Sequence, residues 1–241
     1  MSDSANPEIF FWIDELMVKK TDPWLEALME CLKKDASYGQ LCDAFEVKRR
    51  SHRSFDANFL REFSEHLEKA EKPQIAVVLT GTRDVLLALG REQEQTTKFL
   101  EEVDPLVVDL LQKYQAHPKH GLLLIGAFPL DEPAEDSHPF SLEGYDALSH
   151  KFNSLLMTRV QDRLTKQWNI AFESPCLFFC HENRQLAEGI YDKDGLSLTQ
   201  GALNHFFESV MLRVKLLDES RRKGLDLLAR MDEGNLLKQE N

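Results

Sequence analysis

Short apolar runs and longer amphipathic segments alternate along this chain. Four of the runs have the length and continuous apolar character of strands buried on both faces: 9–13, 75–79, 122–128 and 170–179. A weaker candidate of the same kind lies within residues 38–47. We therefore expect each of these segments to form a strand of one sheet.

Between the runs, apolar residues recur every three or four positions, which is typical of the buried face of a helix. Such faces occur at 24–32, 59–67, 103–114 and 148–164, and a last one begins near Thr199. This alternation predicts a three-layer α/β/α sandwich around a mostly five-stranded parallel sheet. Ligands bind beyond the carboxyl ends of the strands in such sheets, so those loops should border any site.

The net charge changes which partners we expect. A formal charge of -12 opposes non-specific attachment to nucleic acid or to anionic membrane. No apolar run approaches the roughly 18 residues that span a bilayer, and the N-terminal segment lacks the pattern of a signal peptide. We expect an intracellular protein of the cytoplasm or nucleus that does not bind membranes.

The four cysteines do not suggest a disulfide framework in a chain of 241 residues. Cys176, Cys180 and His181 lie close together in sequence, but they lack the paired spacing of structural zinc sites, and the segment has the character of an apolar strand. We expect neither a metal ion nor another cofactor.

Three short blocks carry a resemblance to a known family. IFFWIDELM resembles the opening strand and Gly-Asp-Ser-Leu turn of SGNH hydrolases, also called GDSL-type esterases, with Asp14 and Glu15 at the aspartate and serine positions. VVLTGTRDVL is similar to the family's Gly-x-Asn-Asp block, with Gly81 and Asp84 at matching positions and Arg83 where the family has the asparagine of its oxyanion hole. The blocks occur in the order of the family, which implies a flavodoxin-like fold of the SGNH type.

The last block resembles the family's Asp-Gly-x-His-Leu segment, where aspartate orients the histidine that activates serine. In YDKDGLSL, Asp194 matches the aspartate and Ser197 stands at the histidine position. Acyl transfer needs a hydroxyl nucleophile, an adjacent base and oxyanion donors, and the resemblance implies that all three are changed here. We interpret the chain as a pseudoenzyme, in which Glu15 pairs with Arg83 across a degenerate cleft.

Two alternatives to this interpretation remain open. Glu15 and Asp194 could act as an acid and base pair in a relocated hydrolase site, if one carboxyl pKa is raised. The densest basic run, Lys48, Arg49, Arg50 and Arg53, could bind phosphate or RNA near the cleft, or could be a solvated loop that balances the acidic surface. A small-molecule substrate is not expected.

The C-terminal segment is the predicted partner-binding element. We expect an SGNH hydrolase-like domain over residues 1–217 and a helical extension over 218–241. Leucines and basic residues alternate along this helix, and basic stems commonly cover apolar surface. The predicted contact residues are Leu216, Leu217, Arg221, Arg222, Leu225 and Leu228. The resulting hypothesis is an adaptor or scaffold in an intracellular complex, with protein partners first and RNA second.

Overall fold

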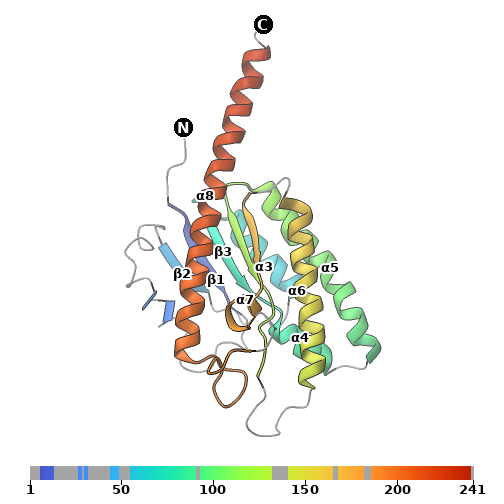
Figure 1. Ribbon diagram of the computed structural model, residues 1–241. Helices are drawn as coiled ribbons and strands as arrows, with labels where there is room; N and C mark the ends of the chain where they lie inside the picture. The colour runs from blue at the N-terminus through green and yellow to red at the C-terminus, as the bar shows by residue number, and fades with distance from the viewer. Residues whose placement is uncertain are drawn as a thin grey trace.

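A parallel sheet lies at the centre of the molecule (Figure 1). The computed structural model describes residues 6–13, 27–28, 30–31, 44–48, 55–90, 93–131, 141–164, 168–181 and 186–239. Within these ranges the strand order is β2-β1-β3-β4-β5, and all four neighbouring pairs are parallel. The strands are β1 Glu8–Trp12, β2 Ala44–Lys48, β3 Gln74–Leu79, β4 Gly121–Ile125 and β5 Ile170–Glu173.

Both faces of the sheet are covered, which explains why its strands are apolar throughout. Side chains alternate between the faces of a strand, so Phe10 and Trp12 pack into one core and Ile9 and Phe11 into the other. The first core is closed by α3 Ala57–Glu68, α4 Thr82–Leu89, α5 Gln93–Ala116 and α6 Leu142–Leu164. The second is closed by α7 Cys176–Phe179, α8 Gln200–Gln239 and the helical residues near Leu28. The predicted three-layer sandwich is confirmed.

The fifth strand is shorter than predicted. β5 ends at Glu173, and residues 176–179, which the sequence assigned to a strand, form the short helix α7. Pro175 causes this change, because its backbone has no N–H for a strand ladder and it adopts a helical conformation. Its carbonyl accepts the Phe178 N–H at 3.0 Å, which starts the turn. The apolar residues that follow therefore belong to a helix.

The helix α8 packs on the sheet and then extends beyond it (Figure 1). Val210, Val214 and Leu217 lie on its buried face. Gly224 continues this contact, because a Cβ atom at that position would lie 1.7 Å from Nε1 of Trp168. The sequence placed the end of the domain at residue 217. The contact between Gly224 and Trp168 shows that α8 still packs against the domain beyond that residue. None of the helices in the described ranges is long and apolar enough to cross a membrane.

Candidate functional site

The turn after β3 is the first element of the site. Gly81 has φ 102° and precedes the first residue of α4. A Cβ atom there would lie 2.2 Å from the ring of Phe152, so both the backbone conformation and the packing require glycine. The next residue, Thr82, accepts the Phe128 N–H on its Oγ1 at 3.0 Å. This contact fixes the turn after β3 against the segment that leaves β4.

The two charged residues of this block have different surroundings. Asp84 is buried in the first turn of α4, and its carboxylate accepts the Phe55 N–H at 2.7 Å. That bond joins the segment before α3 to the turn after β3. Arg83 is half-buried at the same end of the sheet. Asp84 therefore has a structural role here, and the sequence alone gave no sign of its bond to Phe55.

The segment that leaves β4 is held by side chains of α6. The Asn153 carboxamide accepts the Ala127 N–H at 2.7 Å and donates to the Ala127 carbonyl at 2.9 Å. Tyr145 donates its hydroxyl proton to the Phe128 carbonyl at 2.6 Å. These bonds pair the polar backbone groups of a buried, irregular segment. Asn153 therefore holds the segment after β4 against α6.

The loop before α8 lies against this same segment. Tyr191 donates its hydroxyl proton to the Pro129 carbonyl, and the Asp131 N–H donates to the Gly195 carbonyl at 3.1 Å. Gly195 has φ 64°, a left-handed conformation that suits glycine in a tight turn. The structure thus places the last block at the carboxyl end of the sheet, with the segment after β4 between it and Thr82.

Asp194 and Ser197 contact each other directly in this loop. The Asp194 Oδ1 atom accepts the N–H groups of Leu196 at 2.9 Å and Ser197 at 2.7 Å. Its Oδ2 atom accepts the hydroxyl proton of Ser197 at 2.7 Å. Asp194 thus binds backbone and hydroxyl groups of its own turn.

Several predicted site residues lie outside the described ranges. These are Asp14, Glu15, Arg49, Arg50 and Arg53. The expected pair of Glu15 with Arg83 therefore stays a prediction. Lys48 is the last residue of β2, so the basic run begins at the carboxyl end of that strand, where the sequence placed it.

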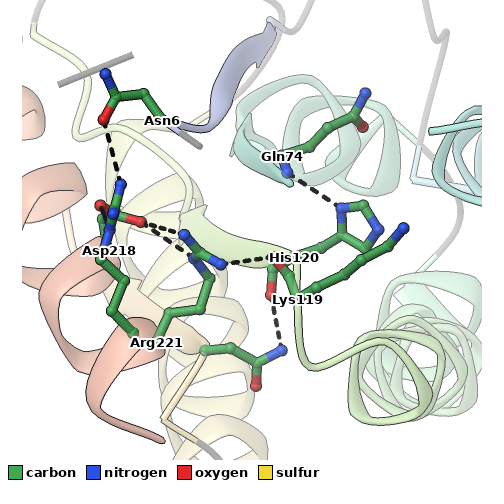
Figure 2. A network of polar contacts seen from close by, with 8 residues as sticks. Asn6, Gln74, Lys119, His120, Asp218 and Arg221 are labelled. Carbon is green, nitrogen blue, oxygen red and sulfur yellow. Dashed lines mark hydrogen bonds and ion pairs between the residues drawn. The ribbon is translucent and has the colours of Figure 1, made fainter. Parts of the chain in front are cut away.

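The predicted partner-binding set on α8 divides into buried and exposed residues. Arg221 is only 1% exposed, and its guanidinium donates to Asp218 Oδ1 at 2.6 Å and to the Lys119 carbonyl at 2.9 Å (Figure 2). Arg222 is half-buried and donates to Asp218 Oδ2 at 2.7 Å. Leu217 is also buried. The expectation that Leu217 and Arg221 form an accessible surface was wrong, because both pack against the amino end of β4.

Other leucines of α8 do form an accessible surface. Leu216 is 47% exposed, as predicted, and Leu212 and Leu227 are 50% and 51% exposed. The helical repeat places these three on one side of α8. Leu225 is half-buried, and Leu228 lies in the part of α8 whose side chains are not described. The sequence missed Leu212 and Leu227, which the same repeat could have found.

Within the described ranges, no group of three or more His, Cys, Asp or Glu residues is arranged to hold a metal ion.

No family model and no curated protein matches the sequence. Solved structures match it in fold. The aryl esterase of M. smegmatis has 15% identity and a TM-score of 0.58, over 88% of this chain and 99% of that chain.

Two further structures give the same result. A variant of an acetyl-xylooligosaccharide esterase from Geobacillus has 14% identity and a TM-score of 0.56, over 90% of this chain and 96% of that chain. A protein from Desulfitobacterium hafniense that bears the G-D-S-L family name has 11% identity and a TM-score of 0.56, over 87% and 99%. The chain has the SGNH-hydrolase fold. At these identities the likeness concerns the fold alone.

Proposed function

We propose that this chain is a noncatalytic domain of the SGNH-hydrolase fold that acts by binding, as an adaptor in a protein complex. The contact of Ser197 with Asp194 carries the proposal. A serine hydroxyl at this position cannot take a proton from a nucleophile near neutral pH, and it occupies the oxygen atom that would orient a histidine.

The sequence of the other two blocks supports the same conclusion. Glu15 stands where the family has its serine, and a carboxylate there repels the negative charge that develops in acyl transfer. Arg83 stands where the family has its oxyanion-hole asparagine. Loss of single triad members costs about 10⁴ to 10⁶ in turnover in a well-studied serine hydrolase. Three changes at once therefore argue against esterase activity.

A matched set of variants tests the proposal. Purified protein is assayed with short-chain aryl acetates beside Asp194→Ala and Glu15→Ala, with a known esterase of this fold as the positive control. We expect no hydrolysis above the buffer rate in any of the three proteins. A rate in the unchanged protein that both substitutions abolish would reject the proposal.

The alternative from a different class is an active hydrolase. The names of the structural neighbours favour it, because they include an aryl esterase and an acetyl-xylooligosaccharide esterase. In this alternative Glu15 and Asp194 act as a carboxylate pair with separated pKa values. It predicts turnover with a bell-shaped pH dependence, which the same assay measures.

The exposed leucines of α8 are the surface that we propose for a protein partner. Leu212, Leu216 and Leu227 present apolar side chains on one side of a helix that extends beyond the domain. Amphipathic helices of this kind dock into apolar grooves. Glutamate substitutions at these three positions should remove the full-length protein from its complex in cell extract. Glutamates at the exposed Leu87 and Met157 on other helices serve as the control and should have no effect.

RNA binding through the basic run is the second partner class that we propose, on the strength of the sequence. Neutralising Arg49, Arg50 and Arg53 should weaken binding to single-stranded RNA and reduce its salt dependence, because each phosphate contact releases a counterion. An unchanged affinity would show that the run is a solvated loop. The matched control removes three exposed lysines elsewhere: Lys69, Lys98 and Lys223.

A further inference from the structure

Two cysteine side chains lie one helical turn apart at the end of β5. Cys176 is the first residue of α7, and the Cys180 N–H donates to the Cys176 carbonyl at 3.0 Å. Residues with this spacing have Cβ atoms about 5–6 Å apart, whereas a disulfide needs Cβ atoms about 3.5–4.5 Å apart. The backbone must therefore bring the two Cβ atoms about 1–2 Å closer before the thiols can bond.

Cys180 lies just outside the helix, at the C-cap of α7. It has φ -111° and ψ 147°, so it is extended, and it forms an antiparallel bridge with Leu186. Cys176 is exposed to solvent, whereas Cys180 is half-buried. Burial raises the pKa of the Cys180 thiol to about 12, and the neighbouring Cys176 sulfur adds to the shift. Cys180 therefore has to lose its proton during disulfide formation, because the thiolate is the attacking form, and this requirement makes its attack the slow step.

We propose that Cys176 and Cys180 form a reversible disulfide when a peroxide oxidises the accessible thiol. The Cys176 sulfur attacks one oxygen of hydrogen peroxide, the O–O bond breaks, and water leaves with the thiol proton, which gives a sulfenic acid. The Cys180 sulfur then attacks the Cys176 sulfur, the S–O bond breaks, and a second water leaves with the Cys180 proton. Two thiols and one peroxide thus yield one disulfide and two waters.

The position of the pair connects it to the rest of the molecule. Phe179 lies between the two cysteines, and its ring packs against Phe128 at 5.8 Å and against Phe206 of α8 at 6.0 Å. Closing the bond changes the backbone on both sides of Phe179. Oxidation is thereby coupled to the segment after β4 and to α8. The proposal rests on α7 alone and holds whether or not the domain is catalytic.

Trypsin digestion gives a direct readout of a disulfide between Cys176 and Cys180. Trypsin releases residues 167–184 as one peptide, which contains Cys176 and Cys180 and no other cysteine. Reduced full-length protein is treated with stoichiometric hydrogen peroxide, alkylated, digested and analysed by mass spectrometry. We expect this peptide to lose two hydrogen atoms and to escape alkylation, and dithiothreitol should restore both thiols.

Variants separate this bond from other oxidation. The double variant Cys31→Ser and Cys42→Ser should form the same product, whereas Cys176→Ser or Cys180→Ser alone should abolish it. Circular dichroism confirms that each variant is folded, and substitution of the exposed Cys176 leaves the core intact. The proposal is overturned if the peptide keeps both thiols, passes to sulfinic acid without a disulfide, or pairs with Cys31 or Cys42.

Discussion

Arg221 and Asp218 form a buried ion pair that anchors α8 at the amino end of the sheet. Their side chains are 1% and 4% exposed, and the nearest nitrogen and oxygen atoms are 2.6 Å apart. Arg221 also donates to the Lys119 carbonyl, just before β4, and Arg222 donates to the other Asp218 oxygen. Two buried charges are tolerated because each is paired and hydrogen bonded.

Removing one member of this ion pair should therefore lower the free energy of unfolding. Asp218→Ala leaves the Arg221 guanidinium buried without its counterion, and such a loss costs about 3–5 kcal/mol. The free energy of unfolding in urea, measured by circular dichroism, checks this value. Glu219→Ala, at the neighbouring exposed position, is the control and should change stability by less than about 0.5 kcal/mol. Equal effects of the two substitutions would contradict the anchoring role.

The buried His120 side chain should make the stability of the folded protein depend on pH. It is fully buried, and its Nδ1 accepts the Gln74 N–H at 3.1 Å. Burial, and after it the charges of Lys119, His117, Arg221 and His66, lower the His120 pKa from 6.5 to about 3. Below pH 6.5 the unfolded chain binds a proton that the folded chain excludes, so stability falls as the pH falls.

The loss of stability that His120 causes at low pH has an expected size and a control variant. Going from about pH 7.5 to about pH 5.5, His120 should remove about 1.4 kcal/mol of stability, since each pH unit below the unfolded-state pKa costs about that amount. His120→Gln should remove this difference while leaving the other titrating groups unchanged. Urea unfolding at the two pH values measures both proteins. Parallel pH profiles would show that His120 is not the group responsible.

Gly81 allows a test of the turn that positions the β3 end of the site. Gly81→Ala places a Cβ 2.2 Å from a Phe152 ring carbon at φ 102°, so we expect a loss of at least about 2 kcal/mol. Gly201→Ala is the matched control, because nothing lies within 4 Å of a Cβ at that helical position. It should leave stability equal or slightly higher. Differential scanning calorimetry of both variants measures the contrast, and similar losses would argue against a turn that requires glycine at position 81.

The sequence predicted the sheet well because its strands are buried on both faces. A continuous apolar run such as β3 has few other structures open to it, and its length excluded a long helix. The same reasoning failed for residues 176–179, where Pro175 and the bond from the Leu177 N–H to the Ser174 carbonyl turn the chain into α7. Apolar composition alone does not separate a short buried helix from a strand.

The sequence was less informative about individual side chains. The order of the blocks placed Gly81 and Asp194 at the correct end of the sheet, because parallel strands all end on the same side. It could not show that Arg221 is buried, since that depends on Asp218 and on the Lys119 carbonyl, which lies far away in the chain. A run of basic residues resembles a solvated helix face until its tertiary partners are known.

The measurement that tests the proposed noncatalytic role most directly is hydrolysis of a short-chain aryl acetate by the unchanged protein and by Asp194→Ala. If the Ser197 hydroxyl has taken the place of a catalytic base beside Asp194, both proteins should match the buffer rate. Turnover by the unchanged protein that is lost in a folded Asp194→Ala variant would contradict the assignment and establish a working hydrolase.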